Sequence, residues 1–73
     1  MKNVVVGGTY RHYKGNLYYV LAIGKDSETL EDVVVYIPLY EPNLSSVWVR
    51  PLAMFTEDVV VEGKAQPRFK QIP

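Results

Sequence analysis

Arginine stands among aromatic side chains at three places in the sequence, and these groupings are best suited to binding chemistry. They are YRHYKGNLYYV (10–20), WVRP (48–51) and PRF (67–69). Arginine holds phosphate through its planar, bidentate fork, and stacking of a base on an aromatic ring contributes about 1–3 kcal/mol. The groupings favour a surface that binds a nucleotide, single-stranded nucleic acid or another phosphate-bearing molecule.

The candidates for catalysis are few. His12 is the single histidine and the first candidate for a general base. Ser27 and Asp26 have the side chains that could complete a triad, since triads are recognised by geometry and not by order. No nucleophile elbow surrounds Ser27, so we expect His12 to be structural and predict no catalytic residue. One histidine, no cysteine and scattered carboxylates also predict no metal site and no cofactor.

A polar loop, KDSETLE (25–31), carries further candidates. Ser27 and Thr29 could donate hydrogen bonds to a ligand, with Glu28 beside them. In the alternative reading, the hydroxyl groups bond the backbone and fix the turn, while Glu28 pairs with Arg11 or Arg50. The sequence leaves both readings open.

Trp48 and Arg50 are two residues apart, so on a strand they share one face, while Val47 and Val49 share the other. A buried arginine needs a partner, because an unpaired buried charge is costly. Arg50 therefore pairs with a carboxylate such as Glu28, or it meets an anion from outside the chain.

Strands must position these residues, because β-branched and aromatic runs recur between turn signals without helical periodicity. Many short strands in 73 residues predict one all-β domain over residues 1–73, a small, mostly antiparallel SH3-like barrel or roll with at most one short helical turn. The expected elements are a hairpin of strands 9–14 and 17–23, strands at 32–40 and 46–50, a helical turn at 51–55 and a second hairpin that turns near Gly63.

A two-residue type II′ turn at Gly15 and Asn16 would fix the register of the first hairpin. It pairs Tyr13 with Tyr18 and His12 with Tyr19, and cross-strand partners point to the same face. The predicted inner face carries Tyr10, His12, Leu17, Tyr19, Leu21 and Ile23, and the predicted outer face carries Arg11, Tyr13, Tyr18 and Val20. The predicted core contains Leu17, Tyr19, Leu21, Val33, Val35, Val49 and Phe55.

Composition narrows the class of partner. The chain has eight basic and eight acidic residues, whereas general affinity for duplex nucleic acid normally accompanies a strongly basic domain. We therefore expect no duplex binding. No apolar run is long enough for a signal peptide or a membrane span, so we expect a cytoplasmic protein without a membrane partner. A core this small makes a homo-oligomer plausible.

Several segments resemble one small bacterial and phage family, catalogued as domain of unknown function 1653. They are GTYRHYKGNLYYVL, SETLEDVVVY, LY, WVRPLAMF and PRF, which together span residues 8–69. The resemblance implies a small SH3-like barrel or roll, and it implies no established activity, cofactor or catalytic residue. The chain departs from the family pattern at Lys25 and Asp26 and in EPNLSS (41–46).

We predict a non-catalytic binding module for a nucleotide or another phosphate-bearing ligand, as would suit a protein that sequesters a nucleotide signal. Tyr13 and Tyr18 would stack on a planar ligand, while Arg11 or Arg50 would meet its anionic group. The full predicted site is Arg11, Tyr13, Tyr18, Ser27, Glu28, Thr29, Trp48 and Arg50. The alternative is a protein-interaction or assembly module, since aromatics and arginine also dominate protein interfaces. An enzyme is the more distant alternative.

Overall fold

The computed structural model describes residues 4–41 and 46–73 as an all-β domain with one short helical turn. The elements are β1 (Thr9–His12), β2 (Leu17–Lys25), β3 (Asp32–Pro38), β4 (Trp48–Pro51), α1 (Leu52–Phe55), β5 (Asp58–Val61), β6 (Lys64–Pro67) and β7 (Phe69–Ile72). A five-stranded antiparallel sheet has the order β4-β3-β2-β1-β7, and β5 and β6 form a separate hairpin. The predicted fold class is confirmed.

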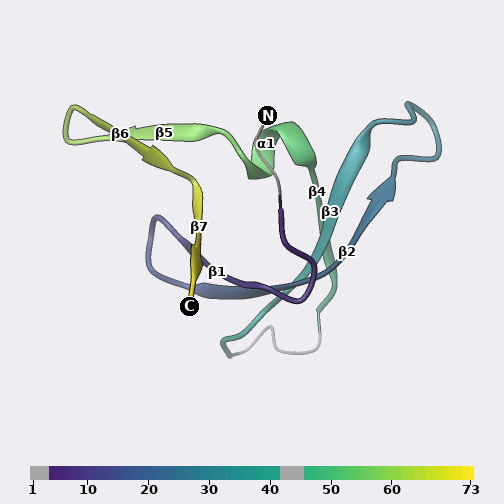
Figure 1. Ribbon diagram of the computed structural model, residues 1–73, viewed down its shortest axis with the longest axis horizontal. Coiled ribbons are helices and arrows are strands. Elements are labelled where there is room, and N and C mark those ends of the chain that lie inside the picture. Colours follow the sequence, from purple (N-terminus) through teal and green to yellow (C-terminus); the bar gives the residue numbers. More distant parts are fainter. Residues whose placement is uncertain (1–3, 42–45) are drawn as a thin grey trace.

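The sheet curves around the helical turn (Figure 1). The strands β1 and β2 pass below α1, β3 and β4 rise on one side of it, and β7 lies on the other. In the described part of the chain, β4 and β7 are the sheet edges and do not pair, so the sheet stays open and does not close into a barrel. The loop between β2 and β3 and the β5–β6 hairpin project on opposite sides.

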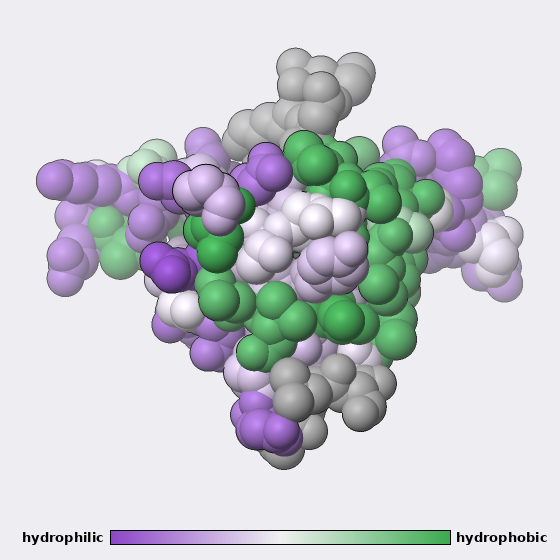
Figure 2. All heavy atoms as spheres, turned by 60° about the horizontal axis from the view of Figure 1, so that its bottom comes forward, coloured by the Kyte–Doolittle hydropathy of each residue, from purple (hydrophilic) through white to green (hydrophobic). Residues whose placement is uncertain are grey.

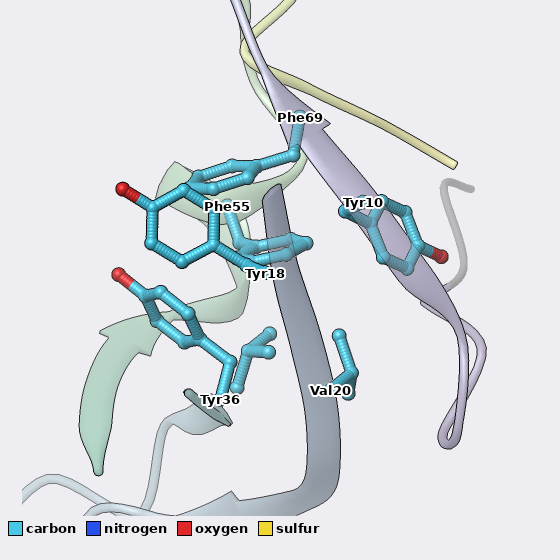
Figure 3. Packing of buried hydrophobic residues seen from close by; sticks show 7 residues of the cluster. Tyr10, Tyr18, Val20, Tyr36, Phe55 and Phe69 are labelled. Atoms are coloured by element: carbon cyan, nitrogen blue, oxygen red, sulfur yellow. The ribbon is translucent and has the colours of Figure 1, made fainter. Parts of the chain in front are cut away.

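Aromatic side chains fill the inner face of the sheet. The buried cluster is Tyr10, Tyr18, Val20, Val34, Tyr36, Phe55 and Phe69. Phe55 of α1 stacks on Phe69 of β7 with ring centres 4.0 Å apart, and it meets Tyr10 and Tyr36 edge-on (Figure 3). Phe55 therefore joins the helical turn to both halves of the sheet.

The first hairpin has a three-residue loop and not the predicted two-residue turn. The carbonyl of His12 accepts a hydrogen bond from the Gly15 N–H at 2.7 Å, and the His12 N–H donates to the Asn16 carbonyl at 2.8 Å. Gly15 has a φ of +109°, as expected for a turn that ends in a glycine bulge. Tyr10 therefore faces Tyr18 across the hairpin.

This register turns the start of β2 over relative to β1, because side chains alternate along a strand and the observed pairing differs from the predicted one by an odd number of residues. The predicted faces were therefore wrong from Leu17 to Val20, whereas Ile23 pairs with the buried Val34 and lies on the inner face as predicted. Tyr18 and Val20 are buried in the core, whereas Leu17 and Tyr19 are only half-buried on the outer face. Of the predicted core, Val33 and Phe55 are buried, Leu17, Tyr19 and Val35 are half-buried, and Leu21 and Val49 are exposed.

An irregularity in β2 restores the predicted faces beyond it. Val20 pairs with Tyr36, but the next paired residue is Ala22, which lies opposite Val35. The bulge at Leu21 inserts one unpaired residue and bends the strand. It lets the long β2 strand curve around the core.

The turn between β5 and β6 lies at Gly63, as predicted. Glu62 and Gly63 have φ angles of 52° and 77°, and Val61 pairs with Lys64, so this is a two-residue type I′ turn. Replacing Glu62 with asparagine, which tolerates the left-handed conformation, should raise the free energy of unfolding by about 0.5–1 kcal/mol. Urea denaturation measures the gain. Glu62→Ala removes the same charge without easing the backbone, so an equal gain in that variant would contradict the explanation.

Candidate anion-binding site

Arg50 lies half-buried on the inner face of β4, at the margin of the aromatic core. Its Nε donates a hydrogen bond to the Tyr36 hydroxyl at 3.2 Å, and its guanidinium carbon lies 5.5 Å from the centre of the Phe69 ring. Among the residues that the structure describes, no carboxylate forms an ion pair with Arg50. Its charge is therefore not neutralised by a carboxylate within residues 4–41 and 46–73.

Two other basic residues, Lys25 and Arg68, differ from Arg50 in this respect. Lys25 pairs with Asp32 at 2.7 Å, and Arg68 pairs with Glu57. Arg68 is held further by its backbone N–H, which donates to the Glu57 carbonyl, although its Nε is buried without a hydrogen-bond partner. Arg68 thus reads as structural, whereas Arg50 keeps capacity for an external anion.

Aromatic rings from several strands form a wall beside Arg50. Tyr18 meets Tyr36 and Tyr40 edge-on, with ring centres 5.5 and 5.6 Å away, and its centre lies 5.9 Å from that of Trp48. The Tyr18 and Tyr40 hydroxyl groups are hydrogen-bonded at 3.0 Å. The Tyr18 and Tyr36 hydroxyls point the same way, away from Val20 (Figure 3). The wall therefore presents polar groups on one side.

Tyr18 remains a neutral phenol at this site. Burial is the main cause that raises its pKa well above the usual value, and the hydrogen bond with Tyr40 raises it further. A tyrosine is already neutral at about pH 7, and the raised pKa keeps the Tyr18 phenol neutral at higher pH as well.

His12 lies on β1 across from Phe69, and their ring centres are 4.9 Å apart. Its Nδ1 accepts a hydrogen bond from the Lys14 backbone N–H at 3.2 Å, which agrees with a structural histidine. Partial burial, followed by the positive charges of Arg50, Arg68 and Lys14, lowers the pKa of His12. The histidine thus reports an electropositive environment.

The lowered pKa of His12 has a consequence for stability. The unfolded chain binds a proton at His12 more readily than the folded chain, so this contribution to stability is full above about pH 6.5 and falls as the pH drops below it. In the folded protein, NMR titration of the imidazole should give a midpoint below 6.5. His12→Asn keeps a hydrogen-bond acceptor but cannot titrate, and it should flatten this part of the pH profile. A folded-state midpoint at or above 6.5 would overturn this account of the site's charge.

The predicted site residues do not all meet in one place. Trp48 and Arg50 share the inner face as predicted, since Trp48 pairs with Tyr36 and Arg50 with Val34. Tyr18 joins them, but it is only 7% exposed and its ring faces pack against protein, so the prediction that it stacks on a ligand was wrong. The cause is the three-residue loop that turned Tyr18 inward.

Two further predicted residues come from β1 and the loop after it. Tyr13 is half-buried, and its ring centre lies 4.5 Å from that of His12, at the margin of the site. Arg11 is exposed on the outer face of β1, opposite Lys70, so it does not join Arg50. The two arginines therefore belong to opposite faces of the sheet.

The predicted polar residues Ser27, Glu28 and Thr29 lie in the loop at the far end of the β2–β3 hairpin. Tyr18 lies near the start of β2, whereas this loop follows the end of β2. A strand as long as β2 spans about 25 Å, so the loop is far from Tyr18. The Asp26 carboxylate accepts the backbone N–H groups of Glu28 and Thr29, and the Thr29 hydroxyl accepts that of Glu31. These contacts support the turn-fixing reading.

The same distance separates Ser27 and Asp26 from His12, so the structure does not assemble the triad considered from sequence. In the described ranges, no group of three histidine, cysteine, aspartate or glutamate side chains could hold a metal ion. No helix within those ranges is both long enough and apolar enough to cross a membrane.

Sequence reasoning missed Tyr36, Tyr40 and Phe69 as members of the site. All three belong to segments that the sequence singles out. Tyr36 and Tyr40 lie in the predicted strand at 32–40, and Phe69 follows Arg68 in PRF. Their convergence on Arg50 depends on the strand order, which places β3 beside β4 and brings β7 to the other sheet edge.

A separate cleft of about 400 Å³ lies between β7 and the segment that follows α1. Its lining is Val4, Tyr10, Phe55, Thr56, Asp58, Pro67, Phe69, Lys70 and Gln71. The charged lining residues, Asp58 and Lys70, have opposite signs, so the cleft offers no net charge to an anion. Arg50 has a positive charge without a carboxylate partner in the described residues, so its surroundings are the better anion site.

Comparison with known proteins gives a family. A family model described as a protein of unknown function (DUF1653) matches residues 8–71. The chain belongs to the DUF1653 family. A crystal structure of a DUF1653 protein from Bordetella bronchiseptica is 39% identical and superposes with a TM-score of 0.82, covering 90% of this chain and 85% of that chain. This structure and the family match confirm the resemblance seen in the sequence.

No curated protein matches this DUF1653 chain. The family description names no activity and no ligand. The argument for function therefore starts from the geometry around Arg50.

Proposed function

We propose that this DUF1653 domain is a non-catalytic module that binds a nucleotide or another phosphate-bearing molecule. One observation carries the proposal: Arg50 is half-buried against aromatic rings and has no carboxylate partner in the described part of the chain. Taking a charge out of water is costly unless a counter-charge approaches it. An anion from outside would supply that counter-charge.

The geometry suits phosphate. Tyr36 accepts a hydrogen bond from the Nε of Arg50, and the terminal nitrogens donate to no described residue, which leaves them for a bidentate contact. Tyr40 and Trp48 are half-buried, so each retains ring surface for a planar group. Nucleotides are ligands of the cytoplasm, and the proposal therefore entails a cytoplasmic protein.

The test uses the single tryptophan, Trp48, as a reporter inside the site. Nucleoside monophosphates, cyclic nucleotides and inorganic phosphate are titrated against the full chain, while tryptophan fluorescence and thermal unfolding are followed. At least one phosphorylated compound should change the fluorescence and raise the melting temperature, because a ligand that binds the native state stabilises it. The uncharged nucleoside is the matched control and should do neither. If no phosphorylated compound changes either signal, the proposal fails.

Protein assembly is a second candidate function, and a different observation favours it. The outer face of the sheet exposes aliphatic side chains that belong to no part of the Arg50 site. This face is the subject of the next inference.

A further inference from the structure

The outer face of the five-stranded sheet is covered by hydrophobic side chains. Tyr19 pairs with Ile37 and Val35 pairs with Val49, and each pair points away from the buried face. Val47 and Val49 are each 60% exposed, and Leu21 and Leu39 are 42% and 41% exposed. We call the patch formed by Tyr19, Leu21, Val35, Ile37, Leu39, Val47 and Val49 the outer apolar face.

Figure 2 shows this side of the molecule. Hydrophobic residues gather around a paler centre, and hydrophilic residues lie toward both lateral margins. An antiparallel sheet that faces water usually alternates apolar and polar residues, so that its solvent side is polar. The outer apolar face departs from this rule over adjacent strands, which marks it as a surface that another molecule covers.

The accessible surface of the chain also supports a partner on this face. The accessible surface is 5059 Å² for a mass of 8.3 kDa. The scaling of surface with mass gives about 4,600 Å² for a compact monomer of this size. A standard interface removes about 800 Å² per partner, and five strands about 4.8 Å apart make a face of comparable extent. The sheet is therefore large enough to carry a stable interface.

The charges at the two ends of the face identify the partner. At one end, Arg11 lies directly opposite Lys70, and neither forms an ion pair with a carboxylate in the described residues. Like charges opposite each other on neighbouring strands are destabilising, so an anionic group of a partner would relieve the repulsion at this end. At the other end, the loop between β2 and β3 carries an excess of acid, contributed by Asp26, Glu28, Glu31 and Asp32 against Lys25.

A second copy of the chain satisfies both ends at once. In a symmetric dimer the same patch meets itself, so it must be self-complementary. A two-fold axis through the middle of the outer apolar face, at right angles to the line between its ends, lays each basic end over the partner's acidic end. The aliphatic side chains then meet in the centre.

We infer that the outer apolar face is the interface of a symmetric homodimer in which the two sheets pack face to face with their ends reversed. Arg50 lies on the inner face of the sheet, so both anion sites stay open in this dimer. The inference therefore does not depend on the proposed ligand, and either can fail without the other.

The test is the solution mass of the full chain by sedimentation velocity and light scattering at high micromolar protein. The wild type should have twice the chain mass of 8.3 kDa. Val49→Lys should be monomeric at the same concentration, because the interface would bury an unpaired charge and its dissociation constant should rise more than about tenfold. Val47→Lys, at an equally exposed position, is a second variant in case the first fails to fold.

The matched control is Val60→Lys on the β5–β6 hairpin, where the valine is 74% exposed but lies outside the outer apolar face. This variant should remain dimeric. Arg11→Glu should weaken the dimer, and added salt should weaken the wild-type dimer, because screening reduces the attraction between the charged ends. A monomeric wild type, a dimeric folded Val49→Lys, or a Val60→Lys that dissociates equally would each overturn the inference.

Discussion

Replacing Phe55 with alanine should lower the free energy of unfolding by about 3–5 kcal/mol. The Phe55 side chain is 1% exposed, and it is the buried residue of the helical turn α1. It stacks on Phe69 and meets Tyr10 and Tyr36 edge-on, so its removal opens a cavity where the helical turn, β7 and the centre of the sheet join. The total free energy of unfolding of a native protein is roughly 5–15 kcal/mol, so the variant should lie near the limit of folding.

Urea denaturation followed by circular dichroism measures this loss. The matched control is Met54→Ala in the same helical turn, where the side chain is 43% exposed and the expected loss is below about 1 kcal/mol. A similar loss in both variants would contradict this account, because it would show that the burial of Phe55 in the aromatic core is not the cause.

Arg50→Ala should weaken binding of the phosphorylated ligand by roughly 1.5–3 kcal/mol, which is about ten- to a hundredfold in the dissociation constant. The reason is the loss of a charged, bidentate hydrogen-bond donor that no other arginine replaces, because Arg68 is paired with Glu57 and Arg11 lies on the other face of the sheet. Arg50→Lys keeps the positive charge but not the bidentate fork, so its affinity should lie between those of the wild type and Arg50→Ala. Calorimetric titration at one salt concentration compares the three proteins.

Lys64→Ala is the control for net charge, because Lys64 lies on the separate β5–β6 hairpin (Figure 1). It should bind as the wild type does. If Arg50→Ala unfolds, the contacts of Arg50 with Tyr36 and Phe69 belong to the stability of the fold. If a folded Arg50→Ala binds the ligand unchanged, the anion sits elsewhere.

The sequence was sufficient to predict the class of fold and several of its secondary-structure elements. Turn signals between β-branched and aromatic runs predicted the all-β domain, the helical turn after Pro51 and the hairpin at Gly63. These features depend on local conformational preference, which neighbouring residues determine. The faces of the first hairpin depend instead on the length of one turn, and Gly15 suits both a two-residue and a three-residue loop. A change of that kind moves every side chain of the strand to the other face.

The candidate site was predicted in part for the same reason. Trp48 and Arg50 share a face because they are two residues apart on one strand, and that prediction is confirmed. The link of Ser27 and Thr29 to Tyr18 was wrong, because the length of β2 separates their loop from Tyr18 near the start of that strand. Phe69 approaches Arg50 through the order of the strands, which spacing along the chain does not specify.

The central claim is that the uncompensated charge of Arg50 receives an anion, and NMR tests it most directly through the single histidine and the single tryptophan, which both lie near Arg50. Titrating the best phosphorylated ligand into the wild type should shift the Trp48 indole signal and raise the titration midpoint of His12, because an anion beside it favours the protonated imidazole. At the same ligand concentration, both changes should be much smaller in Arg50→Ala. Equal changes in both proteins, or changes confined to the signals of Arg11 and Lys70, would contradict the claim.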